Sequence, residues 1–195
     1  KVSRTYSPWS SKIYGLRKLM AKKVLIIGGV AGGASAAARL RRLDEQSQII
    51  IFERGKYISF ANCGLPYYVG RTIKKRDSLL LQTPENFKAR FNIDVRVENE
   101  VLHIDRKAKQ VEVLDLKTKK KYFENYDKLI LSPGAKPFKP PILGIDNERI
   151  FTLRDVPDAD LINNFIDANK PKRAVIVGAG YIGLEMAENL GHRGL

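Results

Sequence analysis

Two glycine-rich turns, each placed between a short apolar run and a helix-forming stretch, constrain the fold of this chain most strongly. The first is Gly28-Gly29-Val30-Ala31-Gly32-Gly33, which follows an apolar run ending at Ile27. The second is Gly178-Ala179-Gly180-Tyr181-Ile182-Gly183, which follows the run 174–177. A strand, a glycine-rich turn and a helix in this order begin a Rossmann β-α-β unit, whose helix N-terminus binds a dinucleotide pyrophosphate. Two such units favour two dinucleotide sites in one protein.

The first turn departs from the G-x-G-x-x-G pattern, because Val30 stands at the middle glycine position. Glu53 supports a dinucleotide site despite this departure. It ends the second predicted strand, where a carboxylate can accept hydrogen bonds from both ribose hydroxyls. Gly28 permits the tight turn, and Gly33 permits close packing of helix and strand. The predicted cofactor residues of this unit are Gly28, Val30, Ala31, Gly32, Gly33, Glu53 and Arg54.

Hydrophobic patterns predict the remaining elements. We expect strands at 22–27, 48–52, 128–131 and 173–177, and helices at 31–43, 84–91, 155–169 and from 180 onward, with a short helix inside 59–70. Three alternating stretches between Val95 and Asp127 predict antiparallel strands with a turn near 117–119. Three prolines in 136–144 predict a linker. The fold class is α/β with a small antiparallel β insertion, and we expect a truncated chain, because the second unit stops before its next strand.

Composition and charge exclude several classes of function. The net charge of +14 is concentrated in part in residues 1–23, which hold seven basic and no acidic residues. The remaining excess is dispersed, which favours a solvated basic surface over nucleic-acid binding. No apolar run is long enough to cross a membrane. The two histidines, His103 and His192, are widely separated, so no metal site is expected.

Cys63 is the only cysteine, so no disulfide can form within the chain and a reducing cytoplasm is the expected compartment. It lies in Ser59-Phe60-Ala61-Asn62-Cys63-Gly64-Leu65-Pro66-Tyr67, before a predicted short helix. A helix N-terminus favours the nucleophilic thiolate; the alternative is a buried, inert cysteine. Ser35, Arg39 and Arg42 share one helix face, where arginine can bind phosphate or simply be solvated.

The run Ser59 to Tyr68, the first glycine-rich turn and Leu129-Ile130-Leu131-Ser132-Pro133-Gly134-Ala135 together resemble the coenzyme A-disulfide reductases. These belong to the FAD-dependent pyridine nucleotide-disulfide oxidoreductases. The resemblance covers essentially all of residues 21–195 and implies an FAD/NAD(P)-binding Rossmann-like three-layer fold. Relatives that resemble glutathione reductase carry a C-x4-C motif, whereas Ile58 stands five residues before Cys63 here.

The resemblance implies that NAD(P)H reduces FAD and that electrons then pass to a mixed disulfide between Cys63 and coenzyme A. It also implies FAD contacts at Val101, Ser132 and Gly134, which add to those of the first turn. The nicotinamide cofactor would lie at Gly178, Gly180, Tyr181, Ile182 and Gly183. Coenzyme A would contact Ser35, Arg39, Arg42, Ser59 and Asn62. One basic position used by the family is not evident, because Phe91 stands where we expect it.

The expected organisation has three parts. Residues 1–20 form a non-core extension with Met20 as the natural start, 21–145 the first half of an FAD-binding domain, and 146–195 the beginning of an NAD(P)H-binding domain. The full-length form is expected to be a homodimer. Three alternatives stay open: an NADH oxidase or peroxidase that uses a cysteine sulfenic acid, a polysulfide or persulfide reductase, and an inactive nucleotide-binding fragment.

Overall fold

The computed structural model describes residues 21–195, so the expectations for residues 1–20 lie outside the described residues. Its centre is a parallel sheet with the strand order β3-β2-β1-β7. These strands are β1 (Lys23–Ile27), β2 (Gln48–Glu53), β3 (Asp94–Val97) and β7 (Lys128–Leu131). β1 pairs with β2 from Lys23 opposite Gln48 to Ile27 opposite Phe52. This pairing brings the ends of β1 and β2, and so the first glycine-rich turn and Glu53, to one edge of the sheet.

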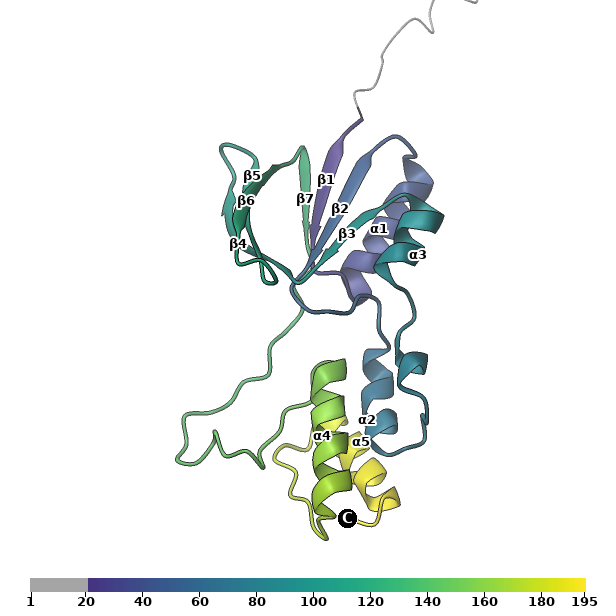
Figure 1. The fold of residues 1–195 in the computed structure, drawn as a ribbon, viewed down its shortest axis with the longest axis vertical. Coiled ribbons are helices and arrows are strands. Elements are labelled where there is room, and N and C mark those ends of the chain that lie inside the picture. The colour runs from purple at the N-terminus through teal and green to yellow at the C-terminus, as the bar shows by residue number, and fades with distance from the viewer. Residues whose placement is uncertain (1–20) are drawn as a thin grey trace, which may run out of the picture.

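Helices cover one face of this sheet. They are α1 (Ala31–Leu43) and α3 (Pro84–Phe91), and Figure 1 shows both on the same side of the strands. Ala34 and Ala37 of α1 are buried against Ile26, Ile49 and Ile51. The small alanines let the helix approach the sheet closely, and the branched side chains fill the space between them. α3 begins as expected, with the Thr83 hydroxyl accepting from the Asn86 N–H at 3.2 Å.

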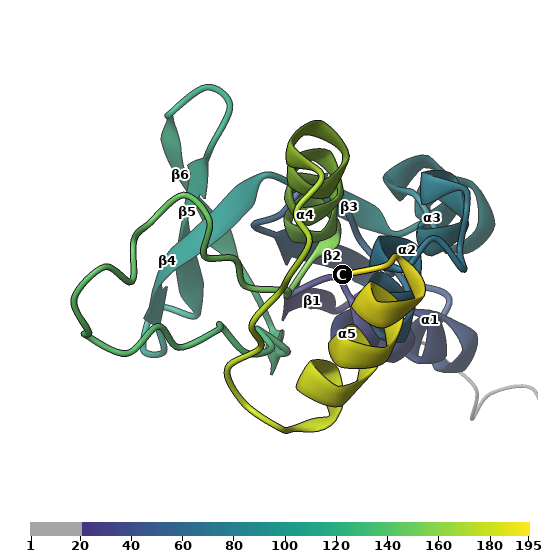
Figure 2. The same ribbon diagram turned by 90° about the horizontal axis from the view of Figure 1, so that it is seen from below.

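An antiparallel sheet covers the other face, with the order β4-β5-β6. Its strands are β4 (Asn99–Asp105), β5 (Gln110–Asp115) and β6 (Lys121–Asn125). Val111 and Val113 of β5 are fully buried against Leu25, Ile50 and Phe52 of the parallel sheet. Figure 2 shows the antiparallel strands and the two helices on opposite sides of the parallel sheet. The three-layer α/β architecture with an antiparallel insertion is therefore confirmed.

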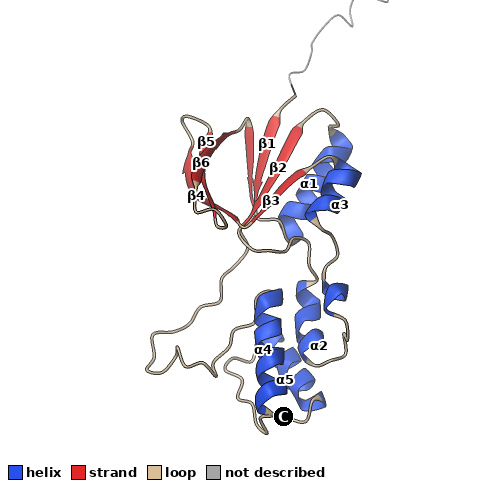
Figure 3. Ribbon diagram, in the orientation of Figure 1, coloured by secondary structure: helices blue, strands red, loops and turns tan. Residues whose placement is uncertain are grey.

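A second group of helices lies beyond the edge of the sheet where β1 and β2 end (Figure 3). It contains α2 (Leu65–Val69), α4 (Val156–Asn169) and α5 (Tyr181–His192), and two short 3-10 turns, Asn62–Gly64 and Arg76–Leu79, lie nearby in the chain. Tyr68, Val156, Ile162 and Met186 belong to its shared apolar core. The expected linker 136–144 has no helix or strand.

The expected antiparallel strands between Val95 and Asp127, with a turn near 117–119, are confirmed as β4, β5 and β6. Residues 95–97 are the exception, because they belong to β3, which pairs parallel to β2. The chain returns to the sheet through α3, and a crossover of this kind delivers a parallel strand. The strand expected at 128–131 is present as β7, but it is not buried as expected. β7 is an outer strand of the sheet, and Leu131 is 60% exposed. Residues 173–177 form no strand: no neighbouring strand among residues 21–195 pairs with them, and Val175 is 90% exposed.

Candidate functional site

The turn between β1 and α1 depends on two glycines. Gly28 has φ +95°, in the left-handed region, and a Cβ built there would lie 2.0 Å from the Ser132 carbonyl oxygen. A Cβ on Gly33 would lie 1.7 Å from the Gly28 carbonyl oxygen. Since both obstacles are backbone atoms, no side-chain movement could make room. The chain can bend sharply here and bring the start of α1 against the sheet edge only with glycine at both positions.

The N-terminus of α1 carries no side-chain cap. Its N-cap residue is Val30, which has no hydrogen-bonding group, and the first turn contains no acidic residue. The first N–H groups of a helix have no partner within the helix, and the helix dipole places partial positive charge on them. An uncapped start is therefore suited to an anion, and the Val30 side chain does not prevent this, because the backbone N–H groups are the donors.

Glu53 lies beside this turn at the end of β2. Its carboxylate accepts hydrogen bonds from the Gly29 N–H at 2.8 Å and from the Gly55 N–H at 2.7 Å. These contacts fix the carboxylate at the strand end while its remaining lone pairs can accept from a ligand. Arg54 follows it and is exposed.

A cavity of about 380 Å³ joins these parts. It is lined by Val30, Ala31 and Gly32 of the first turn, by Glu53 and Arg54, by the turn after β7 that contains Ser132 and Gly134, and by Asn62. The uncapped helix start, the absence of room for side chains at Gly28 and Gly33, and a carboxylate at the strand end fit a dinucleotide such as FAD. The structure thus brings most of the predicted first-site residues to one cavity.

Cys63 directly follows Asn62, which lines this cavity. Asn62, Cys63 and Gly64 form a 3-10 turn directly before α2, and the Cys63 side chain is exposed. Among the described residues Cys63 is therefore not buried, and its reactivity stays a prediction. The Asn62 side-chain oxygen is buried and accepts no hydrogen bond from the residues 21–195 that the structure describes. A buried acceptor of this kind normally has a partner, so it is a candidate contact for a bound group.

Backbone contacts tie the cysteine segment to the glycine turn. The Ser59 N–H donates to the Gly29 carbonyl at 3.0 Å, and the Ala61 N–H donates to the Leu79 carbonyl at 2.8 Å. Ser59 has φ +44°, an uncommon conformation for a residue other than glycine, and such residues are found often at functional sites. The predicted residues Ser59 and Asn62 thus lie on a segment held against the first turn.

The arginine face of α1 is solvent-accessible. Ser35, Arg39 and Arg42 are exposed, and they do not line the cavity. Arg41 lies between them in sequence but has a different role: its guanidinium donates to the carbonyl oxygens of Phe91 and Ser47, both at 2.7 Å. The helix therefore uses Arg41 to hold neighbouring loops and leaves Arg39 and Arg42 available to a ligand.

The second glycine-rich turn shares two features with the first, a glycine with positive φ and a close backbone approach at the last glycine. Gly178 has φ +108°, and a Cβ on Gly183 would lie 2.1 Å from the Gly178 carbonyl oxygen. Gly180 is the N-cap of α5, at the position that Val30 occupies before α1. Tyr181 and Ile182 are exposed on this helix, at 90% and 58%. None of these five residues lines the first cavity, so the two turns form separate candidate sites.

Val101 is the predicted cofactor residue that the structure places elsewhere. It lies on β4 at an irregularity in the pairing with β5 and packs against the core between the two sheets. It lines neither the cavity at the first turn nor a neighbouring cavity of about 500 Å³ that Tyr57, Arg76 and Asp160 line.

Sequence reasoning missed the start of α4 as part of the first cavity. Arg154, Asp155 and Asp158 line it. Asp155 caps α4 by accepting from the Asp158 N–H at 3.0 Å, and the Asp158 carboxylate accepts from the Arg154 N–H at 2.7 Å. Burial raises the pKa of Asp158 above its ordinary value despite that hydrogen bond. The only signal in the sequence is the run Asp155-Val156-Pro157-Asp158, which by itself indicates no more than a helix start.

Two further absences concern the described residues 21–195. None of their helices is both long and apolar enough to cross a membrane. No group of three or more His, Cys, Asp or Glu side chains in this range is placed to hold a metal ion.

Comparison with known proteins places these features in a family. Residues 22–195 match the family model for pyridine nucleotide-disulphide oxidoreductases. The coenzyme A disulfide reductase of Staphylococcus haemolyticus is 48% identical over 174 residues, which are 89% of this chain and 39% of that relative. The chain thus spans about two fifths of the length of this relative.

Solved structures agree with this result. The reduced CoADR-RHD of Bacillus anthracis is 54% identical with a TM-score of 0.87, over 90% of this chain and 32% of that one. An NAD-dependent persulfide reductase from A. fulgidus is 40% identical with a TM-score of 0.85, over 89% and 32%. The water-forming NADH oxidase of Lactobacillus brevis, bound to NADH, is 32% identical with a TM-score of 0.83, over 89% and 38%.

The family resemblance seen in the sequence is therefore confirmed, and so is its cofactor class, because these are FAD- and NAD(P)H-dependent oxidoreductases. Among the relatives are coenzyme A disulfide reductases about as similar to this chain as the one above. With an uncapped helix start at each of two glycine turns and a family model that matches nearly the whole chain, this chain belongs to the pyridine nucleotide-disulphide oxidoreductase family.

Proposed function

We propose that this chain is part of an FAD-dependent NAD(P)H oxidoreductase that reduces coenzyme A disulfide, or a related thiol disulfide or persulfide, through Cys63. One observation carries the proposal. The cavity that begins at the uncapped start of α1 reaches Asn62, the neighbour of the exposed Cys63. A cofactor held at the first turn would then reach the residue next to the sulfur that we propose as the nucleophile.

In this proposal the first turn would hold FAD: the N–H groups of Ala31 and Gly32 would bind its pyrophosphate, and the Glu53 carboxylate would accept from a ribose hydroxyl. When bound, FAD supplies a two-electron carrier between NAD(P)H and a disulfide. Ser132 and Gly134 would contact FAD from the β7 side, and Gly178, Gly180 and Gly183 would shape the turn that holds NAD(P)H. With these two sites, we propose that residues 21–145 belong to the FAD-binding domain and residues 146–195 begin the NAD(P)H-binding domain. Val101 would act from the core, behind the cavity.

The chemistry of Cys63 is thiol–disulfide exchange. Its thiolate attacks one sulfur of coenzyme A disulfide, forms a mixed disulfide, and releases one coenzyme A thiolate. Reduction of the mixed disulfide by two electrons releases the second coenzyme A and restores Cys63. Overall, NAD(P)H, one proton and one coenzyme A disulfide give NAD(P)⁺ and two coenzyme A thiols. The exposed position of Cys63 supports access by an external disulfide.

The arginine face supports the substrate assignment. Coenzyme A carries several phosphate oxygens, and Arg39 and Arg42 are exposed guanidinium groups on one side of α1, with Ser35 a turn before them. Ser59 and Asn62 would contact the substrate close to Cys63. The proposed compartment is the cytoplasm, whose reducing conditions keep the Cys63 thiol free. The proposed partner is coenzyme A or a related thiol, in its disulfide form.

A second candidate is an NADH oxidase that cycles Cys63 through a sulfenic acid. The similarity to the water-forming NADH oxidase of Lactobacillus brevis favours it, at 32% identity. The arginine face favours the disulfide, because neither oxygen nor peroxide needs a phosphate-binding surface.

The test uses the protein expressed from its complete reading frame. Turnover of NAD(P)H is measured with coenzyme A disulfide under argon and with oxygen alone, in the wild type and in Cys63→Ser. We expect disulfide-dependent turnover in the wild type and a loss of at least about a hundredfold in Cys63→Ser, while NAD(P)H still reduces the flavin. Turnover that depends on oxygen and not on the disulfide would select the oxidase, and a fully active Cys63→Ser would refute both.

A further inference from the structure

Two tyrosines flank the cysteine segment and reach the same pair of charged side chains. Tyr57 precedes Cys63 in the loop after β2, and Tyr68 follows it on α2. The Tyr57 hydroxyl accepts from the Arg76 guanidinium at 2.8 Å, and the Tyr68 hydroxyl donates to the Asp160 carboxylate at 3.1 Å. Both ends of the segment are thus linked to residues outside it.

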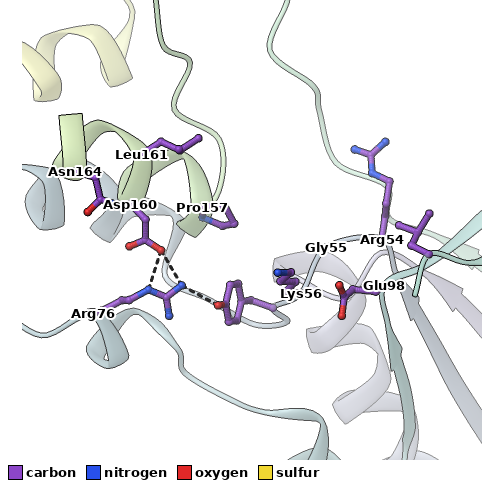
Figure 4. A pocket seen from close by; sticks show the side chains of 11 residues that line it. Arg54, Gly55, Lys56, Arg76, Glu98, Pro157, Asp160, Leu161 and Asn164 are labelled. Carbon is purple, nitrogen blue, oxygen red and sulfur yellow. Dashed lines mark hydrogen bonds and ion pairs between the residues drawn. The ribbon is translucent and has the colours of Figure 1, made fainter. Parts of the chain in front are cut away.

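Arg76 and Asp160 close the connection between the two tyrosines. Arg76 Nε donates to Asp160 Oδ2 at 2.8 Å, and a second guanidinium nitrogen lies 2.8 Å from the same oxygen. Figure 4 shows the Arg76 guanidinium facing Asp160, with dashed lines between the two side chains. Arg76 lies in a 3-10 turn and Asp160 lies on α4. A single carboxylate on α4 therefore holds both flanks of Cys63.

The geometry and the partial burial of this pair favour a fixed arrangement. The side chains of Arg76 and Asp160 are 33% and 26% exposed, and the Arg76 guanidinium also lies over the Tyr57 ring, 4.9 Å from its centroid. Burial raises the pKa of Tyr68, and the hydrogen bond to Asp160 raises it further, so the hydroxyl stays protonated and remains a donor. Ion pairs that are shielded and supported by further hydrogen bonds contribute more than exposed ones.

Polar contacts from α4 and α5 also hold the other end of α2. The Asn163 amide donates to the Tyr68 carbonyl at 3.4 Å, and an Arg193 nitrogen donates to the Val69 carbonyl at 3.1 Å. That nitrogen also donates to the Asn163 side-chain oxygen at 2.7 Å. A donor at a helix C-terminus satisfies carbonyls that the helix leaves free. The position of the short helix after Cys63 is therefore set by the two helices that follow residue 155.

We propose that Asp160 is a positioning residue for Cys63: through Tyr68, and through Arg76 and Tyr57, it fixes both flanks of the cysteine segment relative to α4. The inference rests on the function proposed for Cys63. Because the start of α4 also lines the cavity at the first turn, Asp160 places the sulfur relative to that cavity. An orientation error of about 1 Å at a reacting atom can lower a rate by roughly a hundredfold.

The test compares Asp160→Asn with Asp146→Asn in the protein from its complete reading frame. Asp146 is an exposed carboxylate in the loop before α4, and none of the contacts described above involves it. We expect Asp160→Asn to lower kcat for coenzyme A disulfide about tenfold or more, with KM and the rate of flavin reduction by NAD(P)H changed less than about twofold. Asp146→Asn should leave kcat within twofold, and Asp160→Glu should restore part of the activity that Asp160→Asn loses.

A second readout does not depend on activity. Hydrogen–deuterium exchange of the amides in 59–68 should become at least about threefold faster in Asp160→Asn and stay unchanged in Asp146→Asn. If Asp160→Asn does not fold, Tyr68→Phe removes one hydrogen bond only and should show the same change to a smaller degree. Unchanged exchange and unchanged kcat in the Asp160 variant would overturn the positioning role. Retained disulfide turnover in Cys63→Ser would instead refute the proposed function, so the two failures are distinguishable.

Discussion

At the residue scale, glycines determine the geometry of the two turns, and the sequence predicted this correctly. The glycine pattern alone identifies Gly28 and Gly33, because only a missing side chain permits such close backbone approach. Val30 in place of the middle glycine does not prevent the helix from starting there. Val30 is the N-cap residue of α1, and the N–H groups that would bind an anion belong to the backbone and not to side chains. Arg154 and Asp158 could not be assigned to the same cavity from sequence, because nothing local brings residues so distant in the chain to the first turn.

Gly33→Ala should prevent the first turn from forming as described. Its Cβ would lie 1.7 Å from the Gly28 carbonyl oxygen, so the backbone must shift. We expect a loss of about 2–4 kcal/mol in the free energy of unfolding, measured by urea unfolding, together with weaker FAD binding. Gly191→Ala is the matched control: nothing lies within 4 Å of a Cβ there, and alanine should stabilise α5 by up to about 1 kcal/mol. Equal effects of the two substitutions would contradict this explanation.

The exposed arginines of α1 should affect substrate binding and not the fold. Removing Arg39 and Arg42 together should raise KM for coenzyme A disulfide by roughly tenfold or more, since a hydrogen bond to a charged group contributes about 1.5–3 kcal/mol. KM for a small disulfide without phosphates should not change. Arg106→Ala, an exposed arginine between β4 and β5, is the control and should leave both values unchanged. A KM that rises equally for both disulfides would argue against phosphate recognition.

At the element scale, most helices and strands followed from local signals, and the failures have a common cause. α1, α3 and α4 have the ends that capping residues and hydrophobic patterns predicted. Strands depend instead on their neighbours: β3 became parallel because the chain reaches it through α3, and 173–177 has no partner among the described residues. A strand needs a neighbour to satisfy its backbone groups, and a sequence pattern does not report that neighbour.

The two sheets are joined by an ion cluster around Glu124 of β6. It accepts from Arg96 of β3 at 2.6 Å and from Lys23 of β1. Burial alone would raise the pKa of Glu124, but these hydrogen bonds and charges outweigh it, and its pKa lies below the ordinary 4.5. A carboxyl whose pKa is lowered by folding stabilises the protein above its unfolded pKa, and this contribution is lost as the pH falls through the folded value.

Glu124→Gln should therefore lower the free energy of unfolding at pH 7 by about 1–2 kcal/mol. The difference from the wild type should shrink as the pH is lowered below 4.5, the unfolded value for glutamate, and unfolding in urea across pH 3–7 measures it. Glu112→Gln breaks only the ion pair with Lys121, whose side chain is 59% exposed, and should cost less than about 0.5 kcal/mol. A Glu124→Gln effect that does not depend on pH would contradict the role assigned to its charge.

At the scale of the whole molecule, the cavity at the first glycine-rich turn and the cysteine segment both involve residues of α4 or its start, and the second glycine-rich turn begins α5. The residues that link the cysteine segment to α4 are far apart in the sequence. Tyr57, Tyr68, Arg76 and Asp160 come from four separate segments and are joined by hydrogen bonds between their side chains. The α/β class, the family and the glycine turn that begins the first cavity could be predicted from sequence, because each depends on a local motif, whereas the redox role of Cys63 stays a prediction. The hydrogen bonds that hold the two ends of the cysteine segment could not be predicted from sequence, because they form only when α2, α4 and α5 pack together.

Mass spectrometry of the protein from its complete reading frame, treated with coenzyme A disulfide and then with NAD(P)H, tests the central claim most directly. The account predicts one coenzyme A on the peptide that contains Cys63, and its release when NAD(P)H is added without other reductants. No adduct at Cys63, or an adduct that NAD(P)H does not remove, would contradict the claim that this sulfur carries the electrons to the substrate.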